Sequence, residues 1–224
     1  MKILKVFNNK YSFFLLMIIA LFIIAPIVDI VGMNYSVTTL LVTFVIVMSI
    51  YTANLKNRET NILLFLTLIS FLASVLLSFL SLNNLSYLLF NVALIFIYAK
   101  IILILIIVHI KALLVLEKVD YDMLKVSIII YILLGIFWSF IYLLIYNFDP
   151  DAFSTVHNFP SVAGYYYSFT VLTTLGFGDI VPVNKLAMAI TSLEAICGQI
   201  YISVLVALLV GRHLSSKIEE YKNE

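Results

Sequence analysis

From Thr60 to Ala99 the chain carries no charged side chain. A membrane-spanning helix needs about 20 mostly apolar residues, so this stretch is too long for one helix. The pair Asn83-Asn84 divides it into Ile62–Leu82 and Leu85–Val108. The rest of the chain is similar, since 64% of its 224 residues are hydrophobic and 11% are charged. This composition excludes a soluble enzyme, a nucleic-acid binder and a disordered regulator.

Further apolar runs have the length of a membrane span. They are Ser12–Val31, Val37–Ala53, Val126–Tyr146 and Leu186–Gly211. Lysines before the first run are also typical of signal peptides. That run is longer than the usual signal core and has no cleavage pattern, so we expect a retained helix. The fold class is therefore an all-α membrane protein with six transmembrane helices.

The segments between these runs are polar or short. Asn54–Asn61 is expected to be a polar loop, and the charged, amphipathic stretch Lys111–Lys125 to be a helix on the membrane surface. Val162–Thr173 is apolar but too short to span a bilayer. We expect it to be a re-entrant helix that enters the membrane and returns to the same side.

The distribution of basic residues predicts the orientation. Six spans place both ends of the chain on one side of the membrane. Of the 13 Lys and Arg residues, only Lys100 and Lys185 fall outside the ends and loops of that side. Basic residues accumulate on the cytosolic side, so both termini are expected in the cytosol. The membrane is expected to be a plasma membrane, most simply a bacterial or archaeal inner membrane.

The segment that carries the chemistry follows the re-entrant helix and reads Thr174-Leu175-Gly176-Phe177-Gly178-Asp179. Non-helical backbone at membrane depth is tolerated only where protein buries it or where it lines a water-filled cavity. Glycine accepts positive φ without strain, and alternating such residues can turn successive carbonyl groups toward one axis. Rings of carbonyl oxygens can replace the water shell of a dehydrated cation.

This segment resembles the selectivity filter of potassium channels, usually written T-V-G-Y-G-D. The resemblance continues upstream in Tyr165–Phe169, which is similar to the aromatic pore helix of that family, and downstream in Ile180-x-Pro182. Gly198 stands where the inner helix of the family commonly has a hinge glycine. The similarity covers roughly residues 126–213, and the first four helices carry no motif of the family.

The resemblance implies a homotetramer that conducts K⁺ passively, because each chain supplies one quarter of the filter. It implies a pore domain at 126–213. The apolar runs before this domain predict a four-helix transmembrane domain with an interfacial linker at 1–125, and a short cytosolic tail is expected at 214–224. Neither a catalytic group nor a cofactor other than the permeant K⁺ is expected. The filter would consist of Thr174, Leu175, Gly176, Phe177 and Gly178, with the carbonyls of the first four coordinating K⁺.

Other residues are expected to support the filter. Phe177 replaces the usual tyrosine, so the family's hydrogen bonds from that hydroxyl to the surrounding aromatic residues cannot form. Tyr166 and Tyr167 either bond to Asp179 instead or simply pack around the filter. Thr170 stands where some bacterial relatives have a glutamate behind the filter, so that carboxylate coupling is expected to be absent.

Glu194 is a carboxyl group within the last span, where charges are costly and usually functional. A neutral, hydrogen-bonded Glu194 behind the pore helix and a charge facing the cavity are the two alternatives, and we favour the first. Helical spacing places Gln199, Ile202, Val206 and Val210 on one stripe after Gly198. This stripe either lines the pore or packs against other helices.

Titratable groups outside the membrane leave further alternatives open. Asp149 and Asp151 either concentrate cations at the pore mouth or form a solvated acidic loop. His157 is expected to be a surface residue rather than a proton sensor.

Two other classes of function compete with a channel. Some active K⁺ transporters use degenerate versions of the same loop, but they need several loops in one chain. The other alternative is a structural or regulatory subunit of a larger channel. Lys100 is the one basic residue inside Leu85–Val108, so little voltage sensing is expected.

Overall fold

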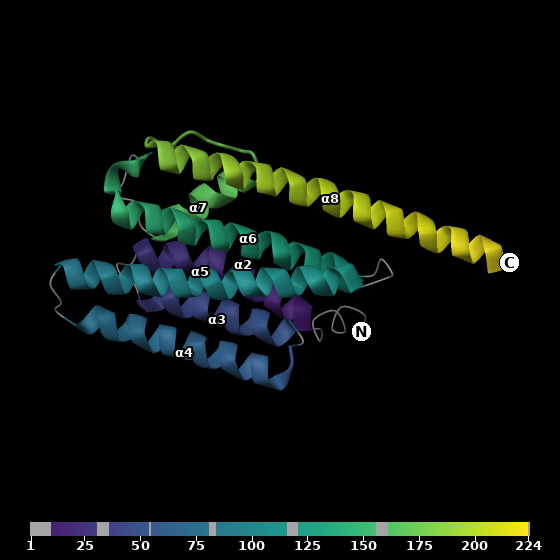
Figure 1. The fold of residues 1–224 in the computed structure, drawn as a ribbon, viewed down its shortest axis with the longest axis horizontal. Coiled ribbons are helices and arrows are strands. Elements are labelled where there is room, and N and C mark those ends of the chain that lie inside the picture. Colours follow the sequence, from purple (N-terminus) through teal and green to yellow (C-terminus); the bar gives the residue numbers. More distant parts are fainter. Residues whose placement is uncertain are drawn as a thin grey trace.

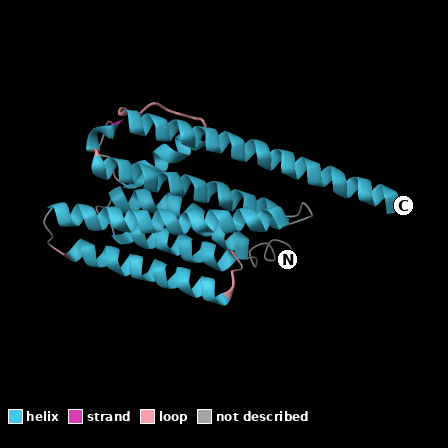
Figure 2. Ribbon diagram, in the orientation of Figure 1, coloured by secondary structure: helices cyan, strands magenta, loops and turns pink. Residues whose placement is uncertain are grey.

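The computed structural model describes residues 10–30, 36–53, 55–80, 84–115, 121–155 and 161–223. Helices dominate this part of the chain (Figures 1 and 2). They are α2 (Lys10–Ile30), α3 (Ser36–Thr52), α4 (Asn57–Phe79), α5 (Asn84–Val115), α6 (Tyr121–Phe148), α7 (Ser161–Leu172) and α8 (Lys185–Asn223). One 3₁₀ turn, η1 (Pro150–Ala152), and two short strands, β1 (Phe153–Thr155) and β2 (Ile180–Pro182), complete the fold.

The long helices run side by side, and α8 lies on the α6 side of the bundle, opposite α4 (Figure 1). Short α7 sits between α6 and the first part of α8. Helix α5 packs along α6, and α2 reaches both α6 and α7. The core of the bundle consists of fully buried aliphatic side chains such as Ile102, Leu105, Ile130 and Leu133. The first helices therefore pack directly on the outer helix of the predicted pore domain.

Four of the described helices are long and apolar enough to cross a membrane. The qualifying segments are Asn57–Leu77, Leu85–Val115, Tyr121–Phe148 and Lys185–Ser215. Helices α2 and α3 contribute shorter apolar segments, Lys10–Ile24 and Thr39–Thr52. The chain is thus a membrane-embedded helical protein, and the count of six spans remains a prediction.

Several helices extend beyond their predicted ends. Residues 57–61, predicted as loop, form the first turn of α4. The predicted surface helix Lys111–Lys125 is divided in the described residues, because Lys111–Val115 ends α5 and Tyr121–Lys125 begins α6. The predicted tail beyond residue 213 continues α8 to Asn223. Charged residues at the end of a span do not stop a helix, since long side chains extend to water while the backbone bonds continue.

The two strands were not predicted and amend the purely α-helical expectation. They pair antiparallel with Phe153 opposite Pro182 and Thr155 opposite Ile180. The backbone N–H of Val183 extends the pairing by donating to the carbonyl of Ala152 at 2.8 Å. Each strand has only three residues, which is too short for the alternation of apolar and polar residues that predicts a strand. The ribbon joins the loop after α6 to the segment that follows the predicted filter.

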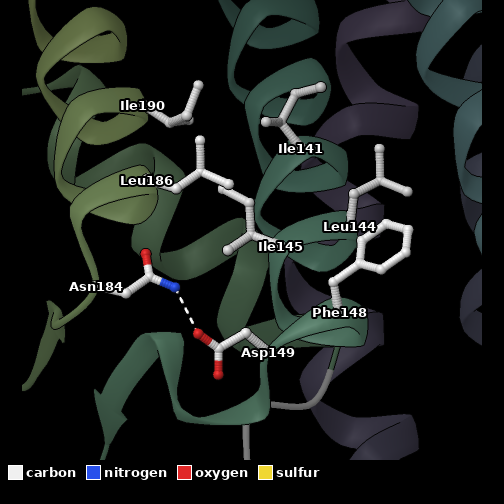
Figure 3. Close-up of a pocket in the computed structure, with 8 residues that line it drawn as sticks. All are labelled: Ile141, Leu144, Ile145, Phe148, Asp149, Asn184, Leu186 and Ile190. Carbon is white, nitrogen blue, oxygen red and sulfur yellow. Dashed lines mark hydrogen bonds between the residues drawn. The ribbon is translucent and has the colours of Figure 1, made fainter.

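Asp149 and Asn184 link the same two segments beside a pocket of about 350 Å³ (Figure 3). Asn184 donates its amide to Asp149 at 2.6 Å, and its carbonyl oxygen caps α8 by accepting from the N–H of Ala187 at 2.7 Å. The remaining lining residues are apolar and come from α6 and α8. Asp149 therefore has a structural contact where α6 ends and α8 begins. Its effect on cations stays a prediction.

Candidate functional site

The backbone after α7 alternates between two conformations. Thr174, Gly176 and Gly178 have positive φ values of 60°, 52° and 81°, and no other described non-glycine residue does. Leu175 and Phe177 therefore keep negative φ between them. This alternation is the conformation that the glycine spacing predicts, and it extends one residue further, to Thr174. A Cβ on Gly176 or Gly178 would meet no atom within 4 Å in the single chain. The need for glycine thus comes from backbone φ.

One carbonyl group anchors the start of this loop to the pore helix. The carbonyl oxygen of Thr170 accepts the backbone N–H groups of Leu175 at 2.9 Å and Gly176 at 3.1 Å. The hydroxyl of Thr170 is buried and donates to the carbonyl of Tyr167 at 2.8 Å. Thr170 therefore holds the loop after α7 through its backbone carbonyl, while its side chain bonds within α7.

The outer end of the loop is held by Tyr166. Its hydroxyl donates to the carboxylate of Asp179 at 2.7 Å, and its ring lies parallel to that of Phe177 with centroids 6.3 Å apart. The hydrogen bond to Asp179, with lesser effects of desolvation and charge, raises the pKa of the Tyr166 phenol. The phenol is thus protonated and donates at neutral pH. Tyr166 thus makes both contacts that the sequence left as alternatives, a hydrogen bond to Asp179 and ring packing on Phe177.

Tyr167 has a different partner. Its hydroxyl lies 2.9 Å from the hydroxyl of Thr191 on α8, and not against Asp179. Burial raises the pKa of this phenol too. The ring packs edge-to-face on Tyr142 and Phe153. Tyr167 therefore links α7 to α8, a contact that its position in a run of three tyrosines does not reveal.

Glu194 lies behind the pore helix and is fully buried. One carboxyl oxygen is 2.5 Å from the hydroxyl of Ser168 on α7, and the other accepts from the hydroxyl of Tyr142 on α6. The Ser168 hydroxyl also lies 2.7 Å from the carbonyl of Gly135. The side chain is thus hydrogen-bonded among three helices, as the favoured alternative describes. Tyr142 was missed, because one tyrosine in an apolar span gives no sign of a carboxyl partner.

Gly198 lies at a close approach between α8 and the end of α7. A Cβ there would be 2.8 Å from the carbonyl oxygen of Leu172. The same oxygen accepts from the hydroxyl of Tyr131 at 3.2 Å. Helix α8 continues through this point, so the structure gives Gly198 a packing role, and a hinge stays a prediction.

The stripe that follows Gly198 is exposed in the single chain. Its members are Gln199, Ile202, Val206 and Val210. Gly198 itself is buried against Leu172 and so faces a different side of α8. Whether the stripe lines a pore remains a prediction.

The remaining candidates are Asp151, Lys100 and His157. Asp151 is exposed at η1, and Lys100 is exposed midway along α5. His157 falls outside the described residues. Within the part of the chain that the structure describes, no three His, Cys, Asp or Glu side chains are placed to hold a metal ion together.

The comparisons with known proteins identify one part of the chain. Residues 143–213 match the model of a protein family described as ion channel. The match begins in α6 and includes α7, the filter loop and most of α8. Searches of curated proteins and of solved structures found no match to this chain. The chain therefore carries an ion channel domain between Leu143 and His213.

Proposed function

We propose that this protein is a K⁺-selective channel that conducts passively across a plasma membrane through a homotetrameric pore. The observation that carries the proposal is that φ alternates in sign from Thr174 to Gly178, inside the ion channel domain. Alternation turns successive carbonyls the same way, so that four chains around one axis offer stacked rings of oxygens. The coordinating carbonyls would be those of Thr174, Leu175, Gly176 and Phe177.

The exposed apolar surface of the single chain supports assembly with other copies. Leu175 and Phe177 are 62% and 66% exposed although both are large and apolar. Helix α8 is also mostly uncovered along its span. Neighbouring copies would cover the filter side chains and one side of α8, leaving the stripe of Gln199, Ile202, Val206 and Val210 toward the axis.

Glu194 would support this pore in the protonated form. Ser168 has one hydroxyl proton, but its oxygen lies near two acceptors, Gly135 O and Glu194 Oε1. If the carboxyl group carries a proton, it can donate to Ser168 while Ser168 donates to Gly135. This arrangement satisfies every oxygen without placing a charge inside the membrane.

A flux assay tests the proposal. Purified protein in liposomes loaded with K⁺ should take up Rb⁺, and uptake should be far slower when Na⁺ is the only internal cation. Gly176→Ala should abolish uptake, because an alanine at positive φ is strained. Gly211→Ala is the matched control, since a Cβ there meets no atom within 4 Å and φ is not positive. Absence of uptake by the wild-type protein would contradict the proposal.

A further inference from the structure

One residue of the first described helix touches the pore helix. The ring of Phe22 on α2 packs edge-to-face on the ring of Phe169 on α7, with centroids 4.9 Å apart and planes at 78°. Helix α2 lies far outside the matched ion channel domain, which begins at residue 143. The contact therefore links the N-terminal helices to the part of the chain that carries the filter.

Phe169 is also in close contact with a glycine. The tip of its ring comes so near Gly135 of α6 that a Cβ on that residue would overlap three ring carbons, Cζ and the two Cε atoms. Gly135 is thus required by this close approach. Phe169 therefore touches both the backbone of α6 and the ring of Phe22, so a change at either contact would displace its ring.

Phe169 directly precedes Thr170, whose carbonyl group holds the start of the filter loop. The carbonyl of Phe169 accepts from the N–H of Thr173 at 3.0 Å and from its hydroxyl at 2.6 Å. The next carbonyl, that of Thr170, accepts the N–H groups of Leu175 and Gly176. A shift of Phe169 would therefore move the backbone carbonyl groups to which the filter loop is hydrogen-bonded.

We propose that Phe22 is a positioning residue, through which α2 holds the pore helix at the depth that keeps the filter conductive. This inference rests on the proposed K⁺ channel function and gives the first helices a role in it. Helices in a bilayer gain little from burying apolar surface against one another, because lipid is equally apolar. The position of one helix against another is therefore fixed by how their side chains fit together, and an edge-to-face aromatic pair supplies a defined geometry for this fit.

Single-channel recordings of the full-length protein in planar bilayers test the proposal. Phe22→Ala should shorten the mean open time by about two- to tenfold, the range that corresponds to loss of one aromatic pair. Phe22→Leu keeps an apolar side chain but removes the ring, and it should also shorten the mean open time. Phe13→Ala is the matched control, because Phe13 and Phe22 lie on the same helix and each is 41% exposed. It should leave the open time unchanged.

A double-mutant cycle separates contact from general destabilisation. If Phe22 acts through Phe169, then Phe22→Ala should have little further effect in a Phe169→Leu background. Equal open times for Phe22→Ala, Phe22→Leu and wild type, or additive effects in the cycle, would overturn the inference and leave a selective channel intact. Should Phe22→Ala not assemble, Phe22→Leu decides by the same criterion. A wild-type protein that conducts no K⁺ would instead refute the proposed function, and this inference with it.

Discussion

The hydroxyl of Ser168 in the pore helix lies 2.5 Å from a carboxyl oxygen of Glu194 in the inner helix. Tyr142 of α6 contacts the other oxygen, so one buried carboxyl group joins α6, α7 and α8. The filter loop begins two residues after α7 ends, and its carbonyl anchor, Thr170, is two residues from Ser168. Packing behind α7 therefore bears directly on the conformation of the proposed filter.

Substitutions of Glu194 distinguish a protonated from a charged carboxyl group. Glu194→Gln should retain tetramer stability and conduction, because its amide can donate to Ser168 and accept from Tyr142. Glu194→Ala should destabilise the protein, since the buried hydroxyl of Tyr142 would lose its carboxyl partner at a cost of about 1–3 kcal/mol, while Ser168 keeps the carbonyl of Gly135. Thermal stability in detergent and Rb⁺ flux measure both effects, and Ser192→Ala on the same helix is the control. If Glu194→Gln proved as damaging as Glu194→Ala, the protonated form would be refuted.

Removal of the Tyr166 hydroxyl should weaken the outer end of the filter. Tyr166→Phe keeps the ring stacked on Phe177 but cannot donate to Asp179. Mean open times should fall, several-fold at most because the hydrogen bond is exposed to water. Tyr87→Phe, an exposed tyrosine on α5, serves as control. Identical open times for Tyr166→Phe and wild type would show that ring packing alone suffices.

The same hydrogen bond predicts a pH dependence. The hydrogen bond to Asp179 raises the pKa of the Tyr166 phenol above its ordinary value of 10.0. A group whose folded-state pKa is raised gives its stabilisation fully below the unfolded pKa and loses it as pH rises through the folded value. The Tyr166 contribution to open time should therefore be constant around neutral pH and disappear only in alkaline solution above the ordinary tyrosine range. A loss of the wild-type advantage over Tyr166→Phe already at neutral pH would contradict this.

Gly198→Ala tests whether that glycine serves close packing. The added carbon would lie 2.8 Å from the backbone oxygen of Leu172, which cannot swing aside as a flexible side chain would. We expect a loss of stability of about 1–3 kcal/mol, typical of overpacking. Gly211→Ala, with no atom near the new carbon, should be neutral. Full stability combined with altered gating in Gly198→Ala would favour a hinge instead.

Lys100 should contribute little voltage dependence. It is exposed midway along α5, and moving one charge through the whole membrane field is worth about 2.3 kcal/mol per 100 mV. A single such charge per chain gives a gentle voltage dependence at most. Conductance between about −100 and +100 mV should therefore vary weakly, and Lys100→Gln should preserve its shape. A steep curve that Lys100→Gln flattens would make α5 a voltage sensor.

The sequence predicted the helices and the filter backbone better than the contacts around them. Gly176 and Gly178 have the positive φ that their spacing predicts, because glycine placement reports backbone conformation directly. The contact between Phe22 and Phe169 was not predicted, because the two residues are far apart in the chain. Hydrophobic periodicity describes the faces of a single helix and does not say which helices pack together. The ends of α5 and α6 were predicted wrongly because hydropathy locates the apolar core of a span and not the last turn of its helix.

The most direct test of a K⁺-selective filter is the reversal potential of the wild-type channel, with K⁺ on one side of a bilayer and Na⁺ on the other. In the proposed tetramer, four carbonyl rings from Thr174–Phe177 would fit a dehydrated K⁺ better than Na⁺. The current should reverse far toward the potential at which K⁺ alone would be at equilibrium. A reversal potential at zero, meaning equal permeability of the two ions, would contradict the account.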